Sequence, residues 1–545
     1  MSTTRKRWIL SLGGLAVVVC LGLAVYVLLP GDPPRPAAAT GSTAVTPTRT
    51  AGQVGTEFVS ALSARRYRTA AQLTDDPVAA EAQLTKADTT LQPSSLVVSA
   101  PPATETATEA TLQLKYDWQL ASGGVWEYAS VVTLVKKDTR WRVRWAPTAV
   151  HPKLVEGRQL ALLAPVPRGA VNAVVDRDGK PVLTWQAGGP KAVDPAFAPL
   201  LMPALRGNAT GAAQDEGAGT NRVALVDAAG KEVENLFGTV GAPVSVEPKK
   251  STLSVRTQAA AQAAVDTVSA PAYLVAIQPS TGGILAVAQN SAAGTAPKAL
   301  NGLYPPGSTF KVVTAAAVLG AGTAGVDTVL PCPGSQVIGT RTIRNADFEL
   351  GPVPLRTAFA KSCNTTFAAL AAGLPLDALP RAAAQFGLAA DFEIPGLTTE
   401  TGRVDAAAGV PAQVENSIGQ GTVQVSPFGL ALMAATVAKG SAVTPGLFTD
   451  VRTTVKVGYQ GPSGATTTAL RTMMREVVTA GRGEALRQYG AVAGKTGTAQ
   501  FGDGSTAHGW FAGYRGDVAF AVLVEDAGAA APAVGVTGKF LGALG

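Results

Sequence analysis

Histidine and cysteine are scarce in this sequence, whose 545 residues include only 2 histidines and 3 cysteines. A structural zinc site of the usual kind needs four Cys or His ligands at short spacings, and no such cluster occurs. A Ser-His-Asp or Cys-His catalytic centre would have to use one of the two histidines. We therefore expect no metal and no other cofactor, and any acyl-transfer chemistry should use lysine or a carboxylate as its base.

Charged residues are also few, at 15% of the chain. They are scattered and form no block like that of a nucleic-acid-binding arm, so no nucleic-acid partner is expected. The net charge of +7 is compatible with an anionic surface such as a membrane or cell wall. The 60 Gly and 37 Pro together make up about 18% of the 545 residues. This fraction is below the roughly 25–30% that marks low-complexity disorder, so most of the chain should fold.

One long apolar run is present near the amino terminus. Residues 8–29 carry no charge and follow Arg5, Lys6 and Arg7. At about 1.5 Å per residue a helix of this length spans the ~30 Å hydrocarbon layer of a bilayer. A cleaved signal peptide is the alternative, but its apolar core is shorter, about 7–15 residues. We expect a single-pass anchor in the cell membrane, with residues 1–7 in the cytoplasm and the rest of the chain outside.

The next part of the chain changes composition twice. Residues 30–50 are rich in Pro, Thr and Ala without apolar periodicity, which is typical of an extended linker. Residues 51–151 combine helical periodicity with three strands of alternating apolar residues, which predicts a small α+β domain. Residues 152–250 contain short strands and a polar loop at 207–219, and we expect a small β-rich pedestal there.

The residues that can carry chemistry begin after residue 252. Ser308 follows two prolines and a glycine at the predicted start of a helix, and Lys311 lies one turn later on the same face. The Lys311 amine can therefore reach the Ser308 hydroxyl, and desolvation near another cation would keep that amine neutral and usable as a base. By itself Ser-x-x-Lys is weak evidence, because a helix cap followed by a surface lysine gives the same pattern.

Two later motifs add to this pattern. Ser362-Cys363-Asn364 lies where one predicted helix ends and another begins, so the Ser362 hydroxyl could pass a proton and the Asn364 amide could hold a substrate amide. Lys495-Thr496-Gly497-Thr498 lies in a strand, where a glycine indicates the close approach of a backbone, here of a ligand. Cys332 and Cys363 could form a disulfide in an exported domain or remain two buried thiols, and the sequence leaves both open.

In this order the three motifs resemble those of penicillin-binding protein transpeptidases and serine β-lactamases. The segments that look like the transpeptidase branch are Tyr304–Lys311, Ile418–Gly421, Val425–Pro427 and Trp510–Gly513. This likeness covers roughly 252–545. The order of elements in 51–151 resembles the NTF2-like domain of some class B penicillin-binding proteins, and residues 168–171 and 176–179 are similar to the family's dimerisation or pedestal domain.

The resemblance implies a multidomain α+β protein whose residues 252–545 form an antiparallel five-stranded sheet with helices and an all-helical subdomain. It implies Ser308 as the nucleophile, Lys311 as its base, Ser362 as a proton shuttle and Lys495 as a source of positive potential. The backbone N–H groups of Ser308 and Thr498 would hold the oxyanion. The implied substrate-binding positions are Asn364, Thr496, Gly497 and Thr498.

The implied reaction transfers the acyl group of a peptidoglycan stem peptide ending in D-Ala-D-Ala to an amine of a neighbouring stem. A β-lactam would trap Ser308 as a stable acyl-enzyme. The alternatives are a D,D-carboxypeptidase or β-lactamase, in which water takes the acyl group, and a β-lactam-sensing module without cross-linking activity. A cell-wall glycosyltransferase is a further partner that the resemblance suggests. The motifs do not distinguish roles in cell elongation, division or sporulation.

Overall fold

The structure, a computed structural model, describes residues 49–120, 124–167, 171–186, 189–239, 245–501 and 506–545. The predicted cytoplasmic tail, membrane anchor and most of the linker lie outside these residues. Within the described part of the chain, no helix is both long enough and apolar enough to cross a bilayer.

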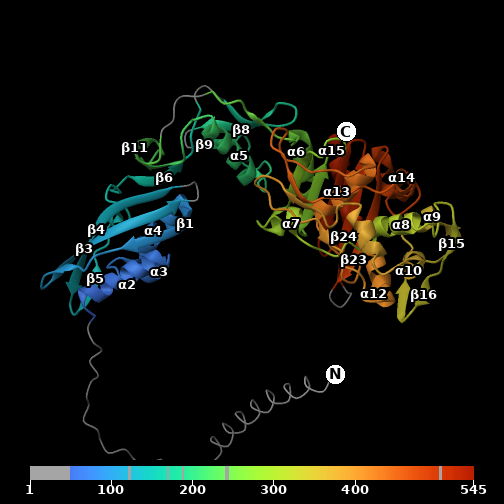
Figure 1. The fold of residues 1–545 in the computed structure, drawn as a ribbon, viewed down its shortest axis with the longest axis horizontal. Helices are drawn as coiled ribbons and strands as arrows, with labels where there is room; N and C mark the ends of the chain where they lie inside the picture. The colour runs from blue at the N-terminus through green and yellow to red at the C-terminus, as the bar shows by residue number, and fades with distance from the viewer. Residues whose placement is uncertain (1–48, 121–123, 168–170, 187–188, 240–244, 502–505) are drawn as a thin grey trace, which may run out of the picture.

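The N-terminal part consists of helices packed on an antiparallel sheet with strand order β1-β3-β4-β5 (Figure 1). Its elements are α2 (Ala51–Ser63), α3 (Tyr67–Ala71), α4 (Pro77–Leu91), β1 (Pro93–Ser99), β2 (Thr104–Glu105), β3 (Glu109–Leu120), β4 (Val125–Lys137), β5 (Arg140–Val143) and the 3₁₀ turn η1 (Pro147–Ala149). Helix α2 starts at a capping box of Thr50 and Gln53. Buried residues alternate along β3, so Leu112 and Trp118 face the helices and pack in one core with Phe58.

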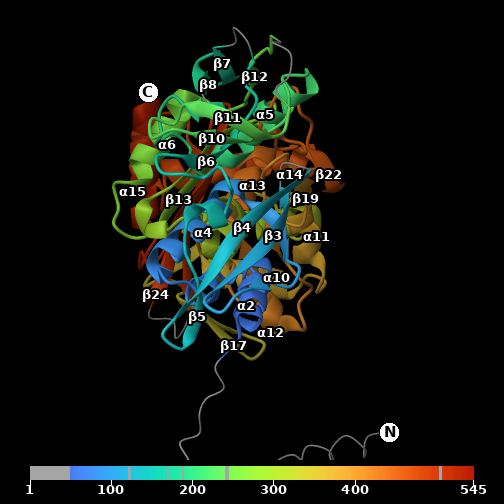
Figure 2. The ribbon, with the colours of Figure 1, turned by 90° about the vertical axis from the view of Figure 1, so that its left-hand side faces the viewer.

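The middle part of the chain contributes to two different cores. Its strands are β6 (Gln159–Leu163), β7 (Asn172–Val175), β8 (Pro181–Gln186), β9 (Gly189–Ala192), β10 (Arg222–Val226), β11 (Glu232–Phe237) and β12 (Lys249–Lys250). Strands β11-β10-β6 form one sheet, and Val223 and Leu225 of β10 join the N-terminal core. Strands β12-β7-β8-β9 form another, and Val174 and Leu183 join the large C-terminal core. Figure 2 shows the second sheet above the first.

The prediction of a polar loop at 207–219 is wrong, because most of this segment belongs to helix α5 (Met202–Asp215). Its buried residues, Met202, Leu205, Ala209 and Ala213, recur at spacings of three and four. The two glycines of this helix, Gly207 and Gly211, lie on its open side, where an added Cβ would meet no heavy atom within 4 Å. This segment thus forms a helix because one of its faces is buried against the C-terminal core.

The C-terminal part is built on a five-stranded antiparallel sheet with strand order β14-β13-β25-β24-β23. Its strands are β13 (Ala272–Ile277), β14 (Ile284–Gln289), β23 (Ala493–Phe501), β24 (Thr506–Arg515) and β25 (Val518–Val524). Helices α6 (Val255–Val265) and α15 (Ala531–Leu544) pack on one face, where they contact Leu274 and Val522. Helices α8 (Lys311–Gly320) and α13 (Pro427–Lys439) belong to the core on the other face, which contains Val275 and Leu523.

The region beside β23 is helical, as predicted, but it is not all-helical. Its further helices are α9 (Leu355–Lys361), α10 (Asn364–Ala372), α11 (Ala378–Ala384), α12 (Val410–Ser417), α14 (Gly464–Thr479) and the 3₁₀ segments η3 (Gly307–Phe310) and η4 (Glu484–Tyr489), whereas η2 (Ser291–Ala293) and α7 (Lys298–Asn301) pack near β13. It also contains paired strands: β15 (Val329–Cys332) with β18 (Leu350–Pro354), β16 (Ser335–Ile338) with β17 (Arg341–Arg344), β19 (Asp391–Glu393) with β22 (Thr454–Val457), and β20 (Gly402–Arg403) with β21 (Gln424–Val425). Prolines such as Pro331 and Pro333 remove helical hydrogen bonds, which explains why the segment around them is extended.

Candidate active site

Ser308 lies in the 3₁₀ turn η3, immediately before helix α8 begins at Lys311. The turn is tight because Gly307 has a φ of +52°, and a Cβ at this position would lie 2.4 Å from the Thr498 carbonyl oxygen. The residue after Ser308 stabilises the turn, because the Thr309 hydroxyl donates a hydrogen bond to the Pro306 carbonyl oxygen. The Lys311 amine lies 3.0 Å from Ser308 Oγ, so the predicted Ser-Lys contact is present.

The Lys311 side chain is fully buried. Its amine hydrogen-bonds the Ser362 carbonyl oxygen at 2.9 Å, Ser362 Oγ at 3.2 Å and Asn364 Oδ1 at 2.6 Å, and it makes no ion pair in the described part of the chain. Burial, reinforced by the positive charges of Lys495 and Arg482, holds the pKa of Lys311 well below its ordinary value. A neutral amine next to a serine hydroxyl can accept its proton.

Ser362 and Asn364 lie at the junction of two helices. Helix α9 ends at Lys361, its C-cap Ser362 is a non-glycine residue in the left-handed region with a φ of +66°, and α10 begins at Asn364. The side chain of Asn345 fixes this junction, since its Oδ1 accepts the Asn364 backbone N–H at 2.7 Å. The residue between them, Cys363, forms a disulfide with Cys332, which answers the question that the sequence left open.

Lys495 reaches the same point from the edge strand β23. Its buried amine donates to Ser362 Oγ at 2.9 Å and to the Thr496 carbonyl oxygen at 3.0 Å. Burial and the positive charge of Arg482 lower the pKa of Lys495 to about 7. Strand β23 lies close to η3, because a Cβ at Gly497 would be only 2.7 Å from the Pro306 carbonyl oxygen.

These residues converge on one cleft with a volume of about 1060 Å³. Ser308, Ser362, Asn364, Thr496 and Thr498 line it. The two buried lysines contact this lining through the hydrogen bonds given above. At Gly497 the backbone of β23 lies close to the backbone of Pro306. The structure therefore brings together all eight site residues that the sequence singled out, from segments that lie up to 190 residues apart (308 to 498).

Arg482 is a member of this site that sequence reasoning missed. It lies between α14 and η4, lines the cleft, and lowers the pKa of both buried lysines. No motif surrounds it, so its proximity to Lys311 and Lys495 follows only from the folded chain.

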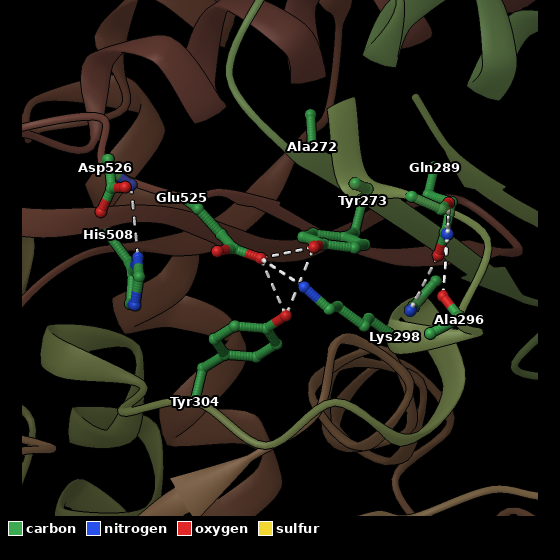
Figure 3. A network of polar contacts seen from close by, with 12 residues as sticks. Ala272, Tyr273, Gln289, Ala296, Lys298, Tyr304, His508, Glu525 and Asp526 are labelled. Atoms are coloured by element: carbon green, nitrogen blue, oxygen red, sulfur yellow. Dashed lines mark hydrogen bonds and ion pairs between the residues drawn. The ribbon is translucent and has the colours of Figure 1, made fainter. Parts of the chain in front are cut away.

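A second missed group supports the loop before Ser308. Tyr304 donates to Glu525 Oε1 at 2.9 Å, the Tyr273 hydroxyl donates to the same oxygen, and the Lys298 amine lies 3.9 Å from it (Figure 3). The Tyr304 ring also meets His508 edge-on, and its backbone pairs with that of Val425. This network ties the loop that carries Ser308 to strands β13, β24 and β25.

The same loop is held from the side of the Lys-Thr-Gly strand. Trp510, opposite Gly497 in the register of β23 and β24, donates its Nε1 hydrogen to the Pro305 carbonyl oxygen at 2.9 Å. Burial lowers the pKa of His508, which keeps that ring neutral next to Tyr304 at neutral pH.

Comparison with known proteins agrees with this geometry. The family model of the penicillin binding protein transpeptidase domain matches residues 272–540, and that of the NTF2-like N-terminal transpeptidase domain matches residues 50–158. The peptidoglycan D,D-transpeptidase PbpA of Mycolicibacterium smegmatis is 34% identical over 261 residues, which are 42% of this chain and 52% of the relative. PbpA of Mycobacterium tuberculosis is 31% identical over 304 residues, which are 46% of this chain and 61% of the relative.

The structure of penicillin-binding protein A from M. tuberculosis, in a ceftriaxone acyl-enzyme complex, has a TM-score of 0.52 at 23% identity and covers 69% of this chain and 98% of that one. The fold and the two matches define a penicillin-binding transpeptidase domain preceded by an NTF2-like domain. The chain therefore contains both of these domains, with the NTF2-like domain first and the transpeptidase domain after it. It spans between half and two thirds of the length of the curated relatives it matches.

Proposed function

We propose that this chain is a serine-type D,D-transpeptidase that cross-links peptidoglycan stem peptides and is acylated by β-lactams. The single observation that carries the proposal is the fully buried Lys311 amine, 3.0 Å from Ser308 Oγ and without an acidic partner in the described structure. The relatives named D,D-transpeptidase and the acyl-enzyme complex of a protein with the same fold support it.

In the acylation step the Ser308 oxygen attacks the carbonyl carbon of the penultimate D-Ala, and Lys311 takes the hydroxyl proton. The backbone N–H groups of Ser308 and Thr498 stabilise the negative charge on the carbonyl oxygen. The C–N bond to the terminal D-Ala then breaks. Ser362, which hydrogen-bonds both lysine amines, relays a proton to the leaving nitrogen, so D-Ala departs as a neutral amine.

In the second step an amine of a neighbouring stem attacks the ester carbon. Lys311 accepts the amine proton, the C–O bond to Ser308 breaks, and the hydroxyl takes the proton back. Asn364 orients the substrate amide, while Lys495, Thr496 and Thr498 bind the terminal carboxylate before D-Ala leaves. Lys495 also supplies the positive potential that keeps Lys311 neutral.

The test uses the purified full-length chain with a stem peptide ending in D-Ala-D-Ala and a labelled D-amino acid as acceptor. The proposal predicts a product in which the acceptor replaces the terminal D-Ala, and no product with Ser308→Ala. Exclusive release of D-Ala by hydrolysis would assign a D,D-carboxypeptidase instead. Acylation by penicillin without turnover of the peptide would assign a β-lactam-sensing module.

We also propose that residues 8–29 anchor the chain in the cytoplasmic membrane, with residues 152–250 as a pedestal that holds the catalytic part above it. The uncharged run after Arg5, Lys6 and Arg7 supports this topology. A cell-wall glycosyltransferase is the proposed partner, because cross-linking acts on strands that such an enzyme polymerises. Protease added outside spheroplasts should degrade the chain after residue 30, and removal of residues 8–29 should release it from the membrane; protection from the protease would contradict this topology.

A further inference from the structure

The charge of the active-site cleft has one sign. Arg344, Lys361 and Arg482 line it, and no Asp or Glu is among its described lining residues. None of the three cations forms an ion pair within the described part of the chain. Arg341, which lies in the same strand as Arg344, is by contrast paired with Glu415. Three uncompensated charges in one concave site attract anions and raise their local concentration.

Arg482 is held in place by the end of helix α9. Its backbone N–H donates to the Ala360 carbonyl oxygen at 3.1 Å, and its Nε donates to the Lys361 carbonyl oxygen at 3.4 Å. Its guanidinium group lies over the Phe348 ring, 4.9 Å from the ring centre. The remaining guanidinium donors are available to a ligand, and they lie next to Lys361, which directly precedes Ser362.

Arg344 approaches the Ser362-Cys363-Asn364 motif from the opposite end. It is the last residue of β17, and its carbonyl oxygen accepts the Asn364 Nδ2 hydrogen at 2.8 Å. Its side chain is exposed. Cations therefore flank both ends of this motif, at Asn364 and at the turn that ends α9.

We propose that this cleft selects stem peptides that carry free carboxylates in addition to the terminal one, with Arg344, Lys361 and Arg482 as specificity-determining residues. The inference rests on the proposed function and names the substrate class of that site. An arginine binds a carboxylate through two parallel hydrogen bonds, whereas a carboxamide offers one acceptor and no charge. Stem peptides whose internal carboxylates are free should therefore be better substrates than the same peptides with those carboxylates amidated.

The experiment compares two synthetic stem peptides that end in D-Ala-D-Ala and differ only in whether their internal carboxylates are free or amidated. The full-length chain should use the free acid with a kcat/KM about tenfold higher, the size expected for one charge-assisted hydrogen bond. The ratio of the two kcat/KM values should fall as salt is added, because Arg344 and Arg482 are exposed to solvent and Lys361 is partly exposed. The ratio of the two kcat/KM values is the quantity to compare between variants. A substitution that also alters Lys311 or Lys495 changes both kcat/KM values by the same factor, so this change cancels in the ratio.

The variants Arg344→Gln, Lys361→Gln and Arg482→Gln should each lower the ratio, and the triple variant should bring it close to one. Lys439→Gln, which neutralises an exposed lysine outside the cleft, should leave the ratio unchanged. Labelling by a fluorescent penicillin on the same samples separates the two proposals. If the wild type is labelled by the penicillin but has the same kcat/KM for both peptides, only the charge selectivity is overturned. If the wild type is not labelled, the proposed function is overturned.

Discussion

The Lys495 amine donates a hydrogen bond to the Ser362 hydroxyl at 2.9 Å, across 133 residues of sequence. Because Lys311 hydrogen-bonds the same hydroxyl, Ser362 connects the two buried amines. The bond also joins strand β23 to the turn between α9 and α10, so the electrostatics and the shape of the site depend on the same contact.

The two lysines predict a bell-shaped pH dependence of acylation by a β-lactam. In acid Lys311 becomes protonated and cannot accept the Ser308 proton, so the second-order rate constant falls. Above about 7, the pKa to which burial and Arg482 lower Lys495, this lysine loses the charge that we propose attracts the carboxylate of the β-lactam. The rate constant should then fall by roughly tenfold per pH unit, which stopped-flow acylation of the free enzyme measures.

Lys495→Arg is the matched variant for this profile. An arginine keeps its charge throughout the range, so the alkaline limb should move to higher pH while the acid limb stays in place. An alkaline limb that stays near pH 7 in the variant would show that another group titrates there.

Gly497→Ala tests the close approach of β23 to the turn that carries Ser308. The added Cβ would lie 2.7 Å from the Pro306 carbonyl oxygen and 2.9 Å from Thr309 Cγ2, so strand and turn must separate. We expect penicillin labelling to slow roughly 100-fold, the effect of misplacing reacting groups by about 1 Å. Gly464→Ala, where an added Cβ meets nothing within 4 Å, should label at the wild-type rate; equal rates for both variants would contradict the close approach.

The sequence identified the motif residues that line the site better than it identified the residues and elements around them. The residues of the three motifs were assigned to one cleft through their resemblance to penicillin-binding protein transpeptidases, because each motif by itself is weak evidence. Arg482 and Glu525 could not be found, since each acts on residues that are distant in sequence: Glu525 meets Tyr304 across 221 positions. Most of helix α5 was mistaken for a polar loop, because the core that buries one of its faces cannot be seen in the sequence.

Tyr304→Phe tests the network that ties the Ser308 loop to the sheet. The variant loses the hydroxyl that donates to Glu525 but keeps the ring beside His508. We expect the free energy of unfolding to fall by about 1–2 kcal/mol and labelling to slow. Tyr459→Phe loses a hydroxyl that accepts the Val443 N–H at 2.8 Å outside the cleft, so it should lose similar stability without slower labelling. Identical labelling by both variants and the wild type would show that the network does not position Ser308.

The disulfide predicts that the melting temperature of the protein falls when a reductant is added. Cys332 and Cys363 are 31 residues apart, and a cross-link of this span contributes about 2–4 kcal/mol to stability. Cys332→Ala/Cys363→Ala should therefore unfold at a lower temperature and label more slowly, since Cys363 lies between Ser362 and Asn364. Reductant should bring the wild type down to the melting temperature of the double variant and leave the variant unchanged. A wild type that does not respond to reductant, with thiols that react freely when it is unfolded, would contradict the bond.

We propose that the neutral amine of Lys311, 3.0 Å from Ser308 Oγ, activates the Ser308 hydroxyl. Its most direct test is to incubate the chain with benzylpenicillin and to locate the added mass by peptide mass spectrometry, while acylation rates are measured for the wild type, Ser308→Ala and Lys311→Met. We expect modification of Ser308 in the wild type, none in Ser308→Ala, and a rate at least roughly 100-fold lower in Lys311→Met, the usual contribution of a general base. Modification of another residue, or a wild-type rate in Lys311→Met, would contradict it.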